Sequence, residues 1–268
     1  MNAIPLLQVD AFTDRAFGGN PAAVCWLEQP RAAEWMQQVA AEMNLSETAF
    51  VEPHPQGFGL RWFTPTVEVE LCGHATLASA HALEVWGRLA PGQAARFLTR
   101  SGWLGAQRQG EWIELDFPAR ATEAAAMPPG LEQALGGVAA SFCGRGPGPL
   151  GVNYLLELGS EAEVRAVRPD FAALARLPLR SLSIASAGTA PYDFVSRFFA
   201  PGGGVNEDPV TGSAHTQLAP YWGKKLGKSE MLAYQASARG GRLRLRLAGE
   251  RVLLGGQAVT VLRGELLA

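Results

Sequence analysis

The spacing of apolar residues predicts that strands and helices alternate along the chain. Residues 4–12, IPLLQVDAF, form an apolar run of strand length, and the Gly-Gly-Asn-Pro turn at 18–21 returns the chain in a second strand. Residues 30–43 place apolar side chains at helical spacing, with Pro30 in the first turn and Asn44 as the C-cap. Further strands are expected over 46–53, 59–64, 151–160, 181–188, 192–201 and 242–247, two or three more over 95–120, and short helices over 131–137 and 168–175.

Two long stretches of the chain resemble one another. Both 61–86 and 197–222 read Arg, an aromatic residue, Phe, any residue and Pro, then a variable loop, then a Gly that opens an Ala-rich run. A match over this length predicts one duplicated unit and therefore two similar lobes, although convergent Ala- and Gly-rich packing is an alternative.

The two Ala-rich runs predict unusual helices. The run that begins at Gly73 is apolar on nearly every side, which is typical of a helix buried inside a curled sheet. The run that begins at Gly212 is again apolar, and Pro220 is expected to kink it. The last residues, around Gly255 and Gly256, predict a closing hairpin.

Composition excludes several classes of protein. The 268 residues allow one large or two medium domains, and the net charge of −2 offers no basic surface for nucleic acid or an anionic membrane. Three widely spaced cysteines do not indicate a disulfide framework. Since neither a signal peptide nor an apolar window of about 20 residues is present, we expect a cytoplasmic protein.

The two glycines that open the helices mark the candidate chemistry. Gly73 and Gly212 would leave backbone N–H groups and a positive dipole end free to hold a carboxylate, and we expect both to face one cleft between the lobes. Singly, each polar neighbour has a structural explanation as a core residue, a cap or a turn former. These neighbours are Cys72, His74, Asp208, Thr211 and Ser213.

Other kinds of chemistry fit less well. The four histidines form no cluster with metal-ligand spacing, the Gly-Gly-Asn-Pro turn lacks the GxGxxG pattern, and no GxSxG elbow is present. A racemase with two thiols needs a cysteine at both helix starts. The second position holds Thr211, whose hydroxyl is too weak a base to partner Cys72.

Several blocks of sequence carry a family resemblance. They are VDAFTDRAFGGNPAAVCWL, MNLSETAFV, RWFTPTVEVELCGHATLASAHAL, RSGWLGAQ, IELDFPA and RFFAPGGGVNEDPVTGSAHTQLAPYW, which together span nearly the whole chain. In this order they resemble the PhzF family, the phenazine-biosynthesis isomerases, which shares the two-lobed fold of diaminopimelate epimerase.

The resemblance implies an α/β (α+β) fold of two pseudo-symmetric lobes, each a mixed β-sheet curled into a barrel around a central α-helix. We expect an N-terminal lobe over 1–118 and a C-terminal lobe over 119–268, with the final strand near 258–268 packing back onto the first lobe. The resemblance also implies an active site between the lobes, no cofactor, no metal and a homodimer.

The resemblance further implies that Glu47, in the NxSET block, is the general acid/base that shifts a double bond in a small carboxylated, amino-acid-like substrate. The substrate-holding residues would be Gly73, His74, Asp208, Gly212 and Ser213, and Cys72, Thr211 and Asn20 would line the site. Two alternatives are an amino- or hydroxy-acid epimerase that uses Cys72, and a ligand-binding relative without turnover.

Overall fold

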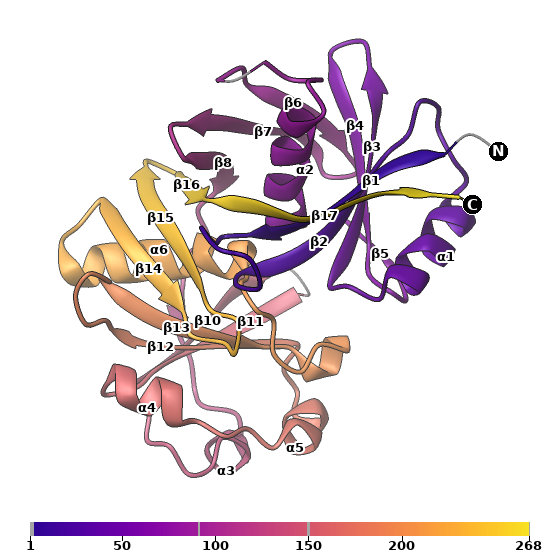
Figure 1. Ribbon diagram of the computed structural model, residues 1–268. Helices are drawn as coiled ribbons and strands as arrows, with labels where there is room; N and C mark the ends of the chain where they lie inside the picture. Colours follow the sequence, from indigo (N-terminus) through magenta and orange to yellow (C-terminus); the bar gives the residue numbers. More distant parts are fainter. Residues whose placement is uncertain (1–2, 91, 149–150, 268) are drawn as a thin grey trace. The chain divides into compact units, whose positions relative to one another are not determined.

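The computed structural model describes residues 3–90, 92–148 and 151–267. Contacts within the chain divide it into two compact units, the first comprising 1–116 with 255–268 and the second 117–254 (Figure 1). Among the described residues, no helix has the length and apolar character needed to cross a membrane.

The first unit is a mixed sheet with two helices. Its strands are β1 (Ile4–Ala11), β2 (Asn20–Trp26), β3 (Glu47–His54), β4 (Gly57–Phe63), β5 (Glu68–Val69), β6 (Ala95–Thr99), β7 (Gly102–Gln109), β8 (Trp112–Pro118) and β17 (Ala258–Leu266), and its helices are α1 (Ala33–Met43) and α2 (Gly73–Val85). The pairing β1–β2 is antiparallel, β2–β3 parallel, β3–β4 antiparallel, β4–β6 parallel and β6–β7 antiparallel.

The second unit repeats this pattern. Its strands are β9 (Glu123–Ala124), β10 (Phe142–Gly148), β11 (Gly151–Glu157), β12 (Ser181–Ala187), β13 (Phe194–Phe199), β14 (Glu230–Gln235), β15 (Gly241–Ala248) and β16 (Arg251–Gly256), and its helices are α3 (Leu131–Ala134), α4 (Glu161–Ala166), α5 (Phe171–Arg176), the 3-10 turn η1 (Pro201–Gly203) and α6 (Gly212–Leu226). From β10 to β15 the pairings run antiparallel, parallel, antiparallel, parallel and antiparallel, as they do from β1 to β7. The internal duplication predicted from sequence is therefore visible in the topology.

Helix α2 is buried because its side chains are small and its hydroxyl groups have partners inside the helix. It contacts β1, β2, β3, β7 and β17, so strands of the first unit lie on several of its sides. Thr76 Oγ1 donates a hydrogen bond to the Cys72 carbonyl at 2.6 Å, and Ser79 Oγ donates to the Ala75 carbonyl at 2.7 Å. Such back-bonding satisfies buried hydroxyls without a partner outside the helix.

Helix α6 tolerates a proline in its interior. Pro220 has no N–H, so the Thr216 carbonyl one turn earlier loses its usual helical donor. The backbone N–H of Arg120 donates to that carbonyl instead, at 2.9 Å. The segment that opens the second unit therefore completes the hydrogen bonding of its central helix.

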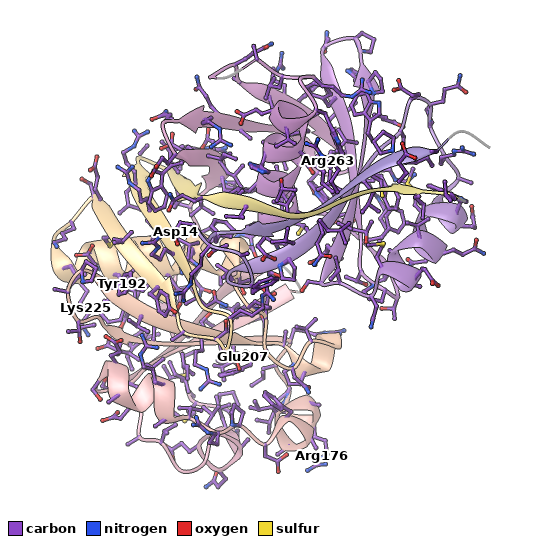
Figure 2. The ribbon with its side chains drawn as sticks, viewed as in Figure 1. Asp14, Arg176, Tyr192, Glu207, Lys225 and Arg263 are labelled. Carbon is purple, nitrogen blue, oxygen red and sulfur yellow. The ribbon has the colours of Figure 1, made fainter. Side chains whose placement is uncertain are left out.

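A matched ion pair appears in both repeats. Arg61 Nε and Nη2 lie 2.8 and 2.9 Å from the Glu68 carboxylate oxygens, and Arg197 Nε and Nη2 lie 2.7 and 2.9 Å from those of Glu207 (labelled in Figure 2). Each guanidinium also lies over the aromatic ring two residues later, Phe63 or Phe199. The same side-on bidentate geometry in both repeats indicates that one local design was duplicated.

Several local expectations need correction. Helix α1 begins at Ala33, so Pro30 precedes the helix by three residues, and Asn44 is the left-handed C-cap that was expected. Asn20 and Pro21 are the first residues of β2, because the connection from β1 is longer than a tight turn. Helix α4 was not predicted, since its six residues are too few to show a period.

The chain ends in the first unit rather than in a local hairpin. Strand β17 pairs antiparallel with β1 from Ile4↔Leu266 to Ala11↔Ala258, with an irregularity between Gln8 and Val9. Figure 1 shows this strand, in yellow, beside the indigo β1. The first unit therefore contains both ends of the described chain.

Candidate active site

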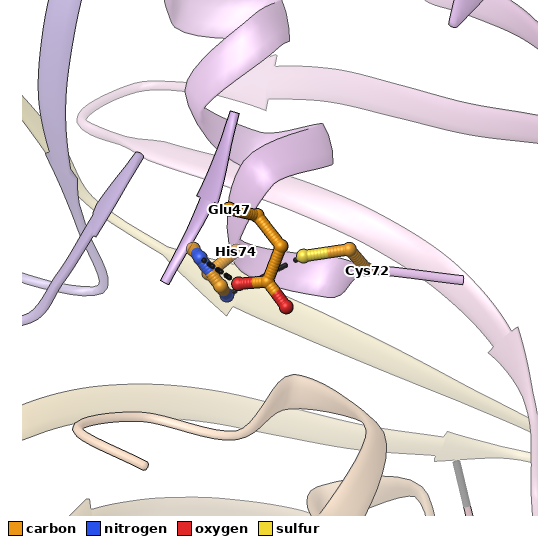
Figure 3. A group of neighbouring side chains, drawn as sticks. All are labelled: Glu47, Cys72 and His74. Carbon is orange, nitrogen blue, oxygen red and sulfur yellow. Dashed lines mark hydrogen bonds and ion pairs between the residues drawn. The ribbon is translucent and has the colours of Figure 1, made fainter. Parts of the chain in front are cut away.

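Three functional side chains converge at the start of α2. Glu47 is the first residue of β3, His74 is the second residue of α2, and Cys72 immediately precedes that helix (Figure 3). His74 and Cys72 are buried, and the Glu47 side chain is 18% exposed. Glu47 lies 25 residues before Cys72 in the sequence (72 − 47 = 25), so the fold brings its carboxylate to the other two groups.

The imidazole of His74 connects the other polar groups. Its Nε2 lies 3.1 Å from Glu47 Oε2, which is an ion-pair distance although the atoms are not aligned as a hydrogen bond. Its Nδ1 lies 3.5 Å from Cys72 Sγ and 3.2 Å from Asn20 Nδ2. The ring therefore has the carboxylate on one nitrogen, and the thiol and the carboxamide on the other.

Charge and burial act in opposite directions at this ring. Burial lowers the pKa of His74, but the negative charges that Cys72 and Glu47 can carry outweigh it, so the pKa lies well above its ordinary value. Burial, followed by the Glu47 charge, raises the pKa of the Cys72 thiol. The Cys72 thiolate and the Glu47 carboxylate are therefore the two charges that stabilise a proton on His74.

The helix start adds backbone donors. Cys72, the N-cap of α2, has an extended backbone with φ −142° and ψ 111°, and its side chain makes no capping hydrogen bond. The N–H groups of the first turn of a helix have no partner within it, so those that begin at Gly73 lie beside Glu47 and His74 as potential anion donors.

The second unit has the corresponding helix start. Thr211 is the N-cap of α6, and its Oγ1 donates to Asp208 Oδ2 at 2.5 Å. Gln235, the last residue of β14, accepts a hydrogen bond from the Thr211 N–H at 2.9 Å and donates from Nε2 to the Asp208 carbonyl at 2.8 Å. Sequence reasoning missed Gln235, because a lone glutamine at the end of a strand carries no motif.

Within each unit the structure groups the predicted residues. Glu47, Cys72, Gly73, His74 and Asn20 lie together in the first unit, and Asp208, Thr211, Gly212 and Ser213 lie together in the second. The other histidines have different roles. The Nδ1–H of His215 donates a hydrogen bond to the Thr211 carbonyl at 2.8 Å, and burial lowers the pKa of this ring to about 4.

The group in the first unit also has metal-binding character. Among the described residues, a carboxylate oxygen of Glu47, Cys72 Sγ and a ring nitrogen of His74 lie within 4.8 Å of one another. The histidine spacing in the sequence did not indicate this group, because Glu47 and Cys72 join the histidine only in the fold.

Comparison with known proteins places this architecture in a family. The family model "PhzC-PhzF: Phenazine biosynthesis-like protein" matches residues 9–264. An uncharacterised isomerase of Halalkalibacterium halodurans is 52% identical over all of both chains, and one of Pseudomonas aeruginosa is 52% identical over 97% of each. The relatives include a phenazine biosynthesis-like domain-containing protein of Homo sapiens, 40% identical over 99% of each chain.

Solved structures agree with this result. A PhzF-family protein of Enterococcus faecalis superposes with a TM-score of 0.94 at 41% identity and covers all of both chains. A hydroxyproline epimerase of Agrobacterium vitis shares the fold alone, with a TM-score of 0.64 at 11% identity over 99% of this chain and 91% of its own.

The fold is the α+β fold of the diaminopimelate epimerase type, and the class of protein is an isomerase. The chain belongs to the PhzC–PhzF, phenazine biosynthesis-like family. The resemblance seen in the sequence blocks is thereby confirmed. Two curated relatives that are 52% identical to the chain are named isomerases, which disfavours a ligand-binding relative without turnover.

Proposed function

We propose that the protein moves a proton between two carbons of a small carboxylated, amino-acid-like substrate without a cofactor, and that Glu47 is the general acid/base. The observation that carries this proposal is the contact of 3.1 Å between Glu47 Oε2 and His74 Nε2 at the start of α2. It joins a partly exposed carboxylate, which can reach a substrate, to a buried imidazole that can hold it in place.

The proposed mechanism uses one carboxylate for both proton transfers. Glu47 takes a proton from a carbon next to an electron-withdrawing group and returns it to another carbon, which shifts the double bond between them. The protonated His74 and the N–H groups at the start of α2 stabilise the negative charge that develops on the substrate. A transferred proton that stays on one carboxylate requires no second base.

Further residues are proposed as substrate-binding groups. In the first unit these are the backbone of Gly73 and the side chain of His74. In the second unit they are Asp208, Gly212 and Ser213, where the α6 N-terminus offers donors and Asp208 offers an acceptor for an amino group. Replacement of Ser213 by Ala tests the second set, and we expect it to raise KM more than it lowers kcat.

Solvent exchange tests the role of Glu47. Small unsaturated or amino-substituted carboxylic acids are incubated with the enzyme in heavy water, and mass spectrometry detects carbon-bound deuterium. We expect exchange with at least one acid, and a loss of about 100-fold or more in Glu47→Gln, as is typical when a general base is removed.

Glu42→Gln is the matched control, because Glu42 is exposed on α1. Its exchange rate should equal that of the unchanged protein. Full exchange in Glu47→Gln would rule Glu47 out as the base.

We also propose that the protein is a homodimer and that it is cytoplasmic. Sedimentation analysis tests the first proposal, and cell fractionation tests the second.

A second candidate is an epimerase in which Cys72 delivers or removes a proton. It is favoured by one observation, the separation of 3.5 Å between Cys72 Sγ and His74 Nδ1, which would let the imidazole take the thiol proton. Inversion of a stereocentre that is lost in Cys72→Ser but kept in Cys143→Ser would support it. Isomerisation that persists in Cys72→Ser would support Glu47 as the only base.

A further inference from the structure

We propose that Glu47, Cys72 and His74 form a binding site for a thiophilic divalent cation, zinc in particular, and that the bound cation inhibits the enzyme reversibly. The proposed metal binding uses the same residues as the proposed catalysis but does not rest on it, whereas the proposed inhibition rests on Glu47 as the base. The metal binding follows from the kinds of donor atom and from their separations in the first unit.

The donor set is of the kind that zinc prefers. Protein zinc sites use cysteine sulfur, histidine nitrogen and carboxylate oxygen, and three protein ligands leave a fourth position open. Soft thiolate and imidazole ligands select zinc and copper over magnesium and calcium, which prefer oxygen alone. Cys72, His74 and Glu47 supply one atom of each kind.

The separations of the donor atoms fit tetrahedral coordination. Bonds of about 2.3 Å to sulfur and about 2.0 Å to nitrogen place those two atoms about 3.5 Å apart at a tetrahedral angle. Cys72 Sγ and His74 Nδ1 are 3.5 Å apart. A carboxylate oxygen of Glu47 lies within 4.8 Å of Cys72 Sγ and of a ring nitrogen of His74, and Oε2 lies 3.1 Å from Nε2, so a rotation of the Glu47 side chain is needed to bring its oxygen to a metal bound at Nδ1.

Asn20 offers a fourth donor. Its Nδ2 lies 3.2 Å from His74 Nδ1. A half-turn of the carboxamide exchanges Nδ2 with Oδ1, and an oxygen at that place suits a metal bound to Nδ1. When the metal binds, the Cys72 thiol releases its proton to the buffer and a sulfur–metal bond replaces the S–H bond.

Metal binding and catalysis exclude each other at this site. A cation held by Glu47 and His74 takes the carboxylate away from the substrate and the imidazole away from the carboxylate. The expected result is inhibition that a chelator reverses.

Titration with zinc ions alone tests the site. Equilibrium dialysis of the full-length chain should show one saturable equivalent, with Cys72→Ser weakening the affinity about 100-fold or more, because even residues that merely support a ligand change it 10- to 100-fold. Cobalt ions give a second readout, a thiolate-to-cobalt charge-transfer absorption that Cys72→Ser removes. Cys143→Ser, at a free cysteine in the second unit, should change neither measurement.

Glu47→Gln should also weaken zinc binding, so the test does not depend on Cys72→Ser alone. Circular dichroism checks that each variant is folded. The proposal is overturned if zinc shows no saturable binding, or if folded Cys72→Ser and Glu47→Gln both bind as tightly as the unchanged protein. Deuterium exchange by the zinc-free protein is measured separately. Exchange without zinc binding leaves only the catalytic proposal standing, and zinc binding without exchange leaves the metal site but not its inhibitory effect.

Discussion

At the scale of single residues, His74 is the group on which the first unit's chemistry depends. One nitrogen faces Glu47, and the other faces Cys72 and Asn20. Because the ring is buried and contacts ionisable groups on both sides, its protonation state depends on those neighbours.

The raised pKa of His74 predicts a definite dependence of stability on pH. The folded protein holds a proton on this ring that the unfolded chain, with a histidine pKa of about 6.5, gives up. This contribution is complete below pH 6.5 and is lost as the pH rises through the folded-state pKa. The difference in unfolding free energy between the unchanged protein and His74→Gln should therefore shrink from pH 6.5 upward.

Denaturant titration at a series of pH values measures this difference, and the imidazole signals in a nuclear magnetic resonance titration report the pKa directly. An imidazole of His74 that loses its proton below pH 6.5 would contradict the assignment.

At the scale of elements, both repeats contain the same kind of arginine–glutamate ion pair, and the arginine of the second repeat is more deeply buried. Arg197 in β13 pairs with Glu207 in the segment that follows that strand, and the pair of Arg61 and Glu68 links β4 to β5. The Arg197 side chain is 9% exposed and its Nη1 also donates to the Val167 carbonyl at 2.7 Å, whereas the Arg61 side chain is 31% exposed. The loss of the carboxylate is therefore expected to lower the free energy of unfolding more in the second unit than in the first.

Removal of each carboxylate should show that difference. Glu207→Gln leaves a buried guanidinium without its counter-charge, so we expect a loss of about 3–5 kcal/mol in unfolding free energy. Glu68→Gln leaves a partly exposed guanidinium, and the expected loss is about 1 kcal/mol or less. Urea unfolding of both variants measures the contrast. Equal losses would show that burial does not distinguish the pairs.

Helix α6 contains a buried histidine whose lowered pKa predicts a loss of stability in acid. His215 is fully buried, stacks on Phe194 and stays neutral, because burial lowers its pKa to about 4. Below pH 6.5 the unfolded chain binds a proton here that the folded chain rejects, so stability falls as the pH falls toward 4. The full effect is about 3 kcal/mol from a shift of this size.

His215→Thr isolates this effect, since Thr76 makes the equivalent contact to the N-cap carbonyl in α2. The variant should be less stable at pH 7 by roughly 2 kcal/mol or more because of the space left beside Phe194, yet lose less stability between pH 7 and pH 4.5. Urea unfolding at both pH values measures it, and an unchanged acid loss would contradict the prediction.

At the scale of the whole molecule, the first unit is closed by the last strand of the chain. Strand β17 supplies partners along the whole of β1, and Leu266 packs against the cluster that contains Ile4 and Leu6. Hydrogen bonds and apolar contacts of the first strand thus depend on residues at the far end of the sequence.

Deletion of residues 258–268 should therefore unfold the first unit, because β1 loses its ladder with β17 and gains an exposed edge. The expected result is aggregation in size-exclusion chromatography and loss of cooperative thermal unfolding. Leu262→Ser is the control: Leu262 is 48% exposed on the same strand, so its change should stay within about 0.5 kcal/mol. A deletion variant that melts as cooperatively as the full chain would refute this dependence.

Much of this architecture could be predicted from local sequence. The alternation of apolar residues, the glycines before two Ala-rich runs and the repeated Arg-aromatic-Phe block predict two similar units with buried helices, because period and capping are properties of neighbouring residues. The blocks around Glu47, His74 and Ser213 indicate the family. The catalytic role of Glu47 stays a prediction, with the His74 contact as its support.

Only the tertiary structure decided which distant groups meet. Gln235 bonds to Thr211, the Arg120 N–H completes the helix at Thr216, and β17 pairs with β1. None of these has a local signal, because any strand of suitable pattern could fill the same place and a lone amide fits many sites. The sequence by itself therefore determined most of the elements, the duplication and the family, whereas the fold decided which groups are partners, since hydrogen bonds and ion pairs depend on distances that chain order does not set.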